Sequence, residues 1–238
     1  MLIRAVSRSR VDQRGFTLAE LLVAVAMIGL VMAGLLTLLT TGSVSYLTGT
    51  NQVATQSALR LTLERMTREI REAGYNTTGL PLCTPPPVPA PCMDSIINAT
   101  ATSFTIQNDW NGNGLIQPAI VVPVAFNFGN VQRGEQTTYS IAGSTLQRQE
   151  SGVDAAAQTL VTNVAQASLG GAAQPFFQYL DADGNVLPTP IANPSLNQSN
   201  IRAVVVNFQG GVQGLTPQSW RAGAIQVTMS DRIRLRNR

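Results

Sequence analysis

The feature that most constrains this chain is an uninterrupted stretch without charged side chains, from Leu21 to Leu59. Its first part, as far as Leu39, is strongly apolar and has about the 20 residues that a helix needs to cross a hydrocarbon core. Glu20 directly precedes the run, at the edge of the span, where an unpaired carboxylate is costly and usually has a function. The leader before it favours a cytoplasmic N-terminus, because it contains the arginines Arg4, Arg8, Arg10 and Arg14.

The whole N-terminal part of the chain has the pattern of one continuous helix, from Phe16 to about Ala73. No proline occurs between Met1 and Leu80, and Gly74 is a suitable stop. Beyond the membrane run, apolar residues recur at helical spacing and predict a face that packs on a core: Leu59, Leu63, Met66 and Ile70.

Residue types that carry much of enzyme chemistry are missing. The chain has no His, so His-based catalysis and His metal ligands are excluded. It contains no Gly-x-Ser-x-Gly elbow, and neither a phosphate loop nor a dinucleotide fingerprint occurs. The formal charge of +3 comes from the leader, because residues 1–15 hold four of the 16 basic residues and one of the 13 acidic residues. The balanced remainder argues against nucleic-acid binding.

The only two cysteines, Cys83 and Cys92, bracket a proline-rich loop. In a chain exported to an oxidising compartment, such a pair would form a disulfide. Closing this loop should stabilise the fold by roughly 2.7 kcal/mol in the loop-entropy model, and by less if the prolines already restrict the unfolded loop. A metal site would need further ligands, and neither a third Cys nor any His is present.

From Ile96 onward the pattern is that of β-strands. Ala142-Gly143-Ser144 should turn two of them into a hairpin. Short strands after one N-terminal helix indicate an α+β fold, with a long transmembrane helix packed on a C-terminal antiparallel β-sheet domain. The predicted strands are Ser103–Gln107, Ile120–Phe128, Thr137–Ile141, Thr145–Gln149, Gln158–Val164, Phe176–Leu180, Ile201–Phe208, Ala224–Met229 and Arg232–Arg236.

The N-terminal stretch resembles the class III signal of type IV pilins and of the pseudopilins of type II secretion. The resemblance rests on the apolar run and on the residues before it, Gly15, Phe16, Thr17, Leu18 and Glu20. It implies that a prepilin peptidase cuts between Gly15 and Phe16 and methylates the new amino terminus, and that Glu20 serves subunit assembly. An ordinary secretory signal would have a shorter apolar core, and a plain single-pass anchor would have no use for Glu20.

This resemblance divides the chain into a prepilin leader (residues 1–15), a long helix (16–74) and a periplasmic β-rich domain (75–238). Residues 16–40 would be the membrane and assembly half of the helix, and residues 41–74 would pack on the globular domain. The implied location is the inner membrane, with a cytoplasmic leader, and then the tip of a pilus or pseudopilus. The implied partners are other major and minor pilins or pseudopilins, the prepilin peptidase, the inner-membrane assembly platform and, before assembly, the lipid bilayer.

The downstream half resembles the larger minor pilins called W and the J pseudopilins. The matching pieces are Gln158–Val164, residues 176–185, Ile201–Val206 and residues 232–238. They imply a low-copy structural subunit, not an enzyme, that primes or caps a filament. The alternative is a pilus-tip adhesin or DNA-uptake receptor that binds through the arginine-rich end or the proline loop. The alternating arginines at that end also suit an edge strand with a charged outer face.

One turn matches the opening of a calcium loop. Asp109, Asn111 and Asn113 place oxygen atoms at alternate positions, and Gly114 stands at the sixth. The twelfth position, where such loops have a bidentate Glu, is Ile120. The same residues fit an Asn-Gly turn between strands, because they tolerate positive φ. Both interpretations stay open, as they do for a second acidic turn formed by Asp181, Asp183 and Asn185.

Overall fold

The structure is a computed structural model, and it describes residues 15–83, 92–117, 120–123, 130–191, 195–210 and 227–237. The chain divides into two compact units, Met1–Gly49 and Thr50–Arg238. The helix α1 (Leu18–Glu72) runs through the boundary between the two units. In the first unit, the described residues are a short segment from Gly15 to Thr17 and the beginning of α1.

Both ends of α1 have a local cause. Thr17 lies outside the helix and caps it, so α1 begins at Leu18 and not at Phe16 as predicted. At the other end Gly74 has a φ of +79°, which a residue without a Cβ adopts readily. Its N–H donates to the carbonyl oxygen of Gln107 at 2.9 Å, so the chain leaves the helix directly into a contact with a strand.

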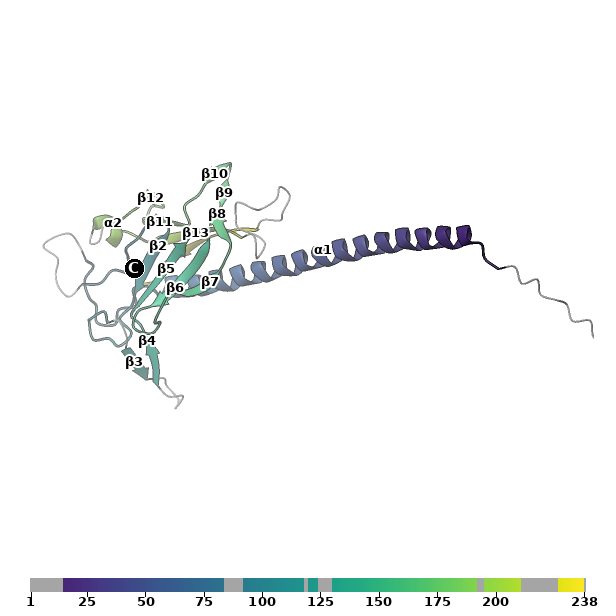
Figure 1. Ribbon diagram of the computed structural model, residues 1–238. Helices are drawn as coiled ribbons and strands as arrows, with labels where there is room; N and C mark the ends of the chain where they lie inside the picture. Colours follow the sequence, from purple (N-terminus) through teal and green to yellow (C-terminus); the bar gives the residue numbers. More distant parts are fainter. Residues whose placement is uncertain are drawn as a thin grey trace, which may run out of the picture. The chain divides into compact units, whose positions relative to one another are not determined.

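Two antiparallel sheets form most of the second unit (Figure 1). The first sheet has the strand order β1-β2-β5-β6-β7. Its hairpin between β5 and β6 turns at Gly143, as predicted, with Ala142 opposite Thr145. The strand bounds are β1 (Ile96–Ile97), β2 (Ser103–Gln107), β5 (Gln136–Ala142), β6 (Thr145–Glu150) and β7 (Gln158–Val161).

The second sheet has the order β12-β11-β13-β14, and β8 also pairs with β13. Two short pairs and one turn of helix complete the described elements. The bounds are β8 (Val164–Gln166), β11 (Phe177–Leu180), β12 (Val186–Leu187), β13 (Ala203–Gly210) and β14 (Val227–Arg234) for the sheet, β3 (Ile120–Pro123) with β4 (Asn130–Arg133) and β9 (Ser168–Leu169) with β10 (Ala172–Ala173) for the pairs, and α2 (Leu196–Ser199).

The division into strands was predicted wrongly at two places, and several other predicted strand ends differ from the observed ends by one or two residues. Ala224–Met229 and Arg232–Arg236 are not separate strands, because β14 runs without a break from Val227 to Arg234. Gln158–Val164 is not one strand, because Asn163 has a φ of +58° and sends the chain from β7 in the first sheet to β8 in the second. The predicted residues 124–128 and 224–226 lie outside the described residues.

The core lies between α1 and the two sheets, within the second unit. The predicted helix stripe faces it: Leu59, Met66 and Ile70 are buried and Leu63 is partly buried. Phe104 of the first sheet meets Phe177 of the second edge to face, with ring centroids 4.8 Å apart. The two sheets therefore share one core. Among the α1 positions whose burial is described, Thr55 is the first buried one, and Asn51 and Gln52 before it are partly buried.

A polar bridge also joins α1 to the first sheet. The Glu69 carboxylate accepts hydrogen bonds from Tyr139 Oη at 2.7 Å and from Arg148 Nε at 3.1 Å. Arg148 also pairs with Glu150 at 2.8 Å and with Asp154 at 3.6 Å. Burial, and then the negative charge of Glu69, raise the pKa of the Tyr139 hydroxyl. The Arg148 side chain is only 9% exposed, so its carboxylate partners are what make its burial tolerable.

Candidate assembly and processing site

The predicted cleavage site lies in front of α1. Gly15, Phe16 and Thr17 have no regular secondary structure, and all three are exposed. Phe16 is 89% exposed, so it is not packed into the described core. A cut between Gly15 and Phe16 would leave Phe16 as the new N-terminus, two residues before the helix begins. The rest of the leader, residues 1–14, lies outside the described residues.

Thr17 and Glu20 form a reciprocal cap at the start of α1. The Glu20 N–H donates to Thr17 Oγ1 at 3.2 Å, while Glu20 Oε2 accepts from the Thr17 N–H at 2.9 Å and from Thr17 Oγ1 at 3.0 Å. This is the capping box that the pattern Thr-x-x-Glu produces at a helix N-terminus. The sequence prediction gave Glu20 a role in assembly only and missed this second role, although the spacing was visible.

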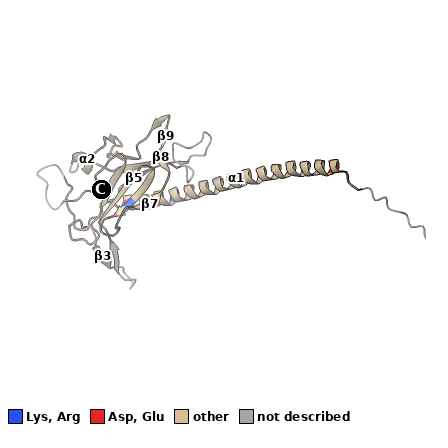
Figure 2. Cartoon of the chain, in the orientation of Figure 1, with Lys and Arg blue, Asp and Glu red and all other residues tan. Residues whose placement is uncertain are grey.

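The Glu20 carboxylate is exposed and, among the described residues, has no cationic partner within ion-pair distance. After the first turn, the first half of α1 has no charged residue (Figure 2). Of the helices in the described part of the chain, α1 is the one long and apolar enough to cross a membrane. Its side chains in this region are exposed, including those of Leu21, Ile28 and Leu39. This surface therefore needs lipid or other apolar helices around it.

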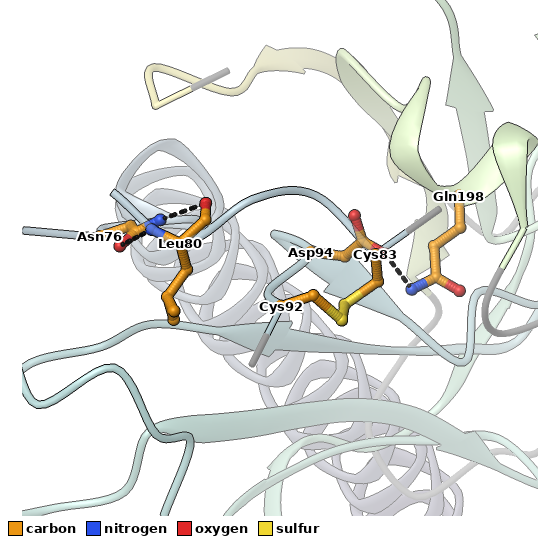
Figure 3. Close-up of a disulfide and its surroundings, with 6 residues drawn as sticks. All are labelled: Asn76, Leu80, Cys83, Cys92, Asp94 and Gln198. Atoms are coloured by element: carbon orange, nitrogen blue, oxygen red, sulfur yellow. Dashed lines mark hydrogen bonds between the residues drawn. A yellow bond between two sulfur atoms is a disulfide. The ribbon is translucent and has the colours of Figure 1, made fainter. Parts of the chain in front are cut away.

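The two cysteines are joined by a disulfide, as the sequence led us to expect (Figure 3). The Cα atoms of Cys83 and Cys92 are 5.0 Å apart. Next to the bridge, the Met93 N–H donates to the carbonyl oxygen of Pro81 at 2.9 Å, so the backbone is also paired at the neck of the loop. The loop itself, residues 84–91, lies outside the described residues.

The turn suggested for calcium is held by its own hydrogen bonds. Asp109 accepts from the N–H groups of Asn113 at 3.2 Å and Gly114 at 3.0 Å. Asn111 Oδ1 accepts from the Asn113 N–H at 2.9 Å, and Asn113 Oδ1 from that of Leu115 at 2.8 Å. Within the described residues, no group of three or more Asp, Glu, Cys or His side chains lies close enough to hold a metal. These hydrogen bonds hold the turn, and they leave each side-chain oxygen a further lone pair.

The sequence prediction missed Glu135, which binds this turn from a later part of the chain. It lies just before β5 and is only 1% exposed. Its carboxylate accepts from the backbone N–H groups of Trp110 at 3.0 Å, Asn111 at 3.4 Å and Gln117 at 2.7 Å. A buried carboxylate is stable when backbone N–H groups satisfy it in this way. No sequence signal marks Glu135, because it is far from the turn along the chain.

The second acidic turn is also held by hydrogen bonds between its own residues. Asp181 accepts from the Asn185 N–H at 2.8 Å and from Asn185 Nδ2 at 3.0 Å. These bonds from Asn185 hold the pKa of the Asp181 carboxyl below its usual value. Asp183 is exposed on the same turn. The structure therefore brings Asp181 and Asn185 together as turn residues.

Part of the arginine-rich end lies in β14, and there it has the predicted charged outer face. In β14, Arg232 and Arg234 are exposed while Ile233 between them is fully buried. Both arginines line a hollow of about 230 Å³ together with Arg202 and Asp181. β14 pairs with β13 alone among the described strands, so it is an edge strand there.

Comparison with known proteins points to the N-terminal segment. Residues 10–36 match the family described as the prokaryotic N-terminal methylation motif. No curated protein matches the sequence. Among solved structures, the chain is similar to a type IV-like pilin from Thermus thermophilus, with 13% identity, a TM-score of 0.38 and coverage of 76% of this chain and 95% of that one. The N-terminal segment thus has the prokaryotic N-terminal methylation motif, and in this chain the motif extends over the start of a long helix that continues into an antiparallel β-sheet domain.

Proposed function

We propose that this protein is a minor pilin or pseudopilin, a structural subunit that primes or caps assembly of a type IV pilus or a type II secretion pseudopilus. In this proposal the leader is cut between Gly15 and Phe16, Phe16 is methylated, and the apolar half of α1 first lies in the inner membrane. The subunit then leaves the lipid and enters a bundle of like helices. The resemblance of its downstream half to W minor pilins and J pseudopilins supports the position at the tip.

The observation that carries the proposal is the first unit of the chain. In its described part, the apolar side chains of α1 are exposed, and the carboxylate of Glu20 lies at the start of the helix. A bilayer accommodates the apolar side chains, but a carboxylate gains nothing from lipid. A helix bundle that brings a neighbouring amino terminus close to Glu20 would accommodate both. This arrangement explains why a charged residue stands before a membrane-length apolar run.

The chemistry of the pair also explains how subunits find their register. The methylated amine of Phe16 in a neighbouring subunit is a cation of the right size to meet the Glu20 carboxylate. Burying either charge alone would cost several kcal/mol, so a helix shifted along the bundle is penalised. The pair therefore selects one axial position for each subunit. Glu20 can keep its capping contact with Thr17 and still offer a second carboxylate oxygen to the amine.

The same features support the proposed location. The leader arginines favour a cytoplasmic N-terminus, and the second unit would then lie across the inner membrane. The disulfide between Cys83 and Cys92 fits the oxidising periplasm. The proposed partners are other pilins or pseudopilins, the prepilin peptidase and the assembly platform.

The test separates the two roles of Glu20. Glu20→Gln keeps a side chain that can complete a capping box but removes the charge. Thr17→Ala removes the cap but keeps the charge, so it is the matched control. We expect Glu20→Gln and Glu20→Ala to be processed at Gly15, yet to lose co-purification with other minor subunits and to reduce piliation or secretion. We expect Thr17→Ala to retain assembly. Normal filaments and co-purification in both Glu20 variants would reject the proposed role.

A second candidate, an adhesin or DNA-uptake receptor on the same scaffold, is favoured by one observation. Arg202, Arg232 and Arg234 line one hollow, and none of them forms an ion pair within the described part of the chain. If this surface binds duplex DNA, Arg232→Gln with Arg234→Gln should weaken binding and lower its dependence on salt. Gln158→Glu changes the charge on an exposed strand of the other sheet and is the control. Equal binding by all variants would dismiss this candidate.

A further inference from the structure

The sequence contains two Asn-Gly pairs, and both lie in the turn held by Asp109 and Glu135: Asn111-Gly112 and Asn113-Gly114. A glycine after asparagine leaves its backbone nitrogen open to attack the asparagine side-chain carbonyl. The nitrogen loses its proton and bonds to Cγ, ammonia leaves, and a five-membered succinimide forms. Water then opens one of its two carbonyl groups, giving an aspartyl or an isoaspartyl residue. The reaction needs no co-reactant except water.

The two backbone nitrogens that could attack, those of Gly112 and Gly114, differ in their hydrogen bonding. The Gly114 N–H donates to Asp109 Oδ2 at 3.0 Å in a buried hydrogen bond. In the described part of the chain, the Gly112 N–H makes no hydrogen bond, while its neighbours on both sides do. A nitrogen whose proton is held by a carboxylate must break a charge-assisted bond before it can attack, and the negative charge opposes loss of the proton.

The two asparagine side chains do not explain a difference between the pairs. Both Asn111 and Asn113 are exposed. Each uses Oδ1 to accept from the backbone N–H two residues later, at 2.9 Å for Asn111 and 2.8 Å for Asn113. The two carbonyl oxygens are therefore alike in exposure and in the bond they accept. Asn111 Nδ2 also donates to Gln117 Oε1 at 3.4 Å, a long bond to the leaving amide that would slow Asn111 and so cannot make it the faster site. The difference that favours attack at Asn111 is the state of the glycine nitrogen.

We propose that Asn111 is a site of spontaneous deamidation in the folded protein and that Asn113, two residues away, is protected by Asp109. The product at position 111 carries a new negative charge in a turn that already contains Asp109 and lies against Glu135. In the isoaspartyl form the backbone also gains one methylene between positions 111 and 112. Both changes strain the hydrogen bonds that hold residues 110–117, so the turn loosens with the age of the protein.

The test is an ageing experiment on the full chain in detergent micelles at neutral to mildly alkaline pH, in water enriched in heavy oxygen. Heavy oxygen enters only at a residue that is hydrolysed during the incubation, and peptide mass spectrometry locates it. In the folded protein we expect the label at position 111, with position 113 at least about tenfold slower because a hydrogen bond to a charged group must first be broken. In the urea-unfolded chain both positions should react at comparable rates.

Two variants sharpen the comparison. Asn111→Gln should abolish labelling at position 111, since closure of the larger ring is slow, and Asn113→Gln should leave it unchanged. Asp109→Asn removes the protecting charge and should raise labelling at position 113; melting curves recorded in parallel show that it is folded. The proposal is overturned if folded wild type labels position 113 as fast as position 111. It is equally overturned if neither position reacts in the folded chain while both react in urea.

Discussion

At the scale of single residues, we expect Gly15 to decide whether the chain is processed. The segment from Gly15 to Thr17 is exposed and not helical, which leaves the peptide bond after Gly15 accessible. We expect the mature protein from membranes to lack residues 1–15 and to have a methylated Phe16, as intact mass would show. Replacing Gly15 by a bulky residue should leave the precursor uncut. A full-length chain in cells with an active prepilin peptidase would contradict the pilin interpretation.

Glu135 provides a second prediction at this scale. Its buried carboxylate accepts three backbone N–H groups. Glu135→Ala would leave these groups without a partner, and we expect a loss of about 1–3 kcal/mol in the free energy of unfolding. The exposed Glu64, changed to Ala in the same way, is the control and should shift stability by less than about 0.5 kcal/mol. Urea denaturation of both variants measures the difference.

The same turn allows a direct test of calcium. Asp109, Asn111 and Asn113 already use their side-chain oxygens on neighbouring N–H groups. If these bonds alone hold the turn, the melting temperature should be the same in chelator and in added calcium. A melting temperature that falls with chelator and recovers with calcium would show that the turn rearranges around a cation.

At the scale of elements, Arg148 ties α1 to the first sheet. Arg148→Met would leave Glu69, Glu150 and Asp154 without their shared cation, and removal of one partner of a buried pair costs up to about 3–5 kcal/mol. Arg65 pairs with the same Glu69, but its side chain is 50% exposed. We expect Arg65→Met to cost less than about 1 kcal/mol. Equal effects of the two changes in denaturant unfolding would mean that the buried network does not hold the helix.

The elements also show what sequence alone could and could not predict. The helix, its apolar stripe and the hairpin at Gly143 follow from local signals, namely spacing, a stop glycine and turn chemistry. The continuity of β14 does not, because Ser230 and Asp231 suggest a break. In the fold Ser230 Oγ donates to Asn207 Oδ1 at 2.7 Å, and Asp231 accepts from Thr67 Oγ1 at 3.3 Å. Distant partners thus allow polar residues inside a strand, and a distant Glu135 likewise completes a turn.

At the scale of the whole molecule, the two units differ in what they need in order to be stable. The buried apolar residues of the described chain all lie in the second unit, from Leu59 onward. The described residues of the first unit form an exposed apolar helix, and none of them belongs to that core. The second unit should therefore fold without the first, while the first depends on lipid or on other helices.

This division gives the last prediction. A chain that begins at Thr50 keeps the buried positions from Thr55 to Ala73 and keeps both cysteines of the disulfide. We expect it to be soluble without detergent and to melt cooperatively. Without a reductant it should not react with a thiol-labelling reagent, because Cys83 and Cys92 remain joined. The full chain should require detergent, since its apolar run has no cover in water. If the shortened chain aggregates or melts without a cooperative transition, residues before Thr50 take part in the fold. The membrane helix would then be a structural part of the domain, and its transfer from lipid to a filament would have to disturb the sheets as well.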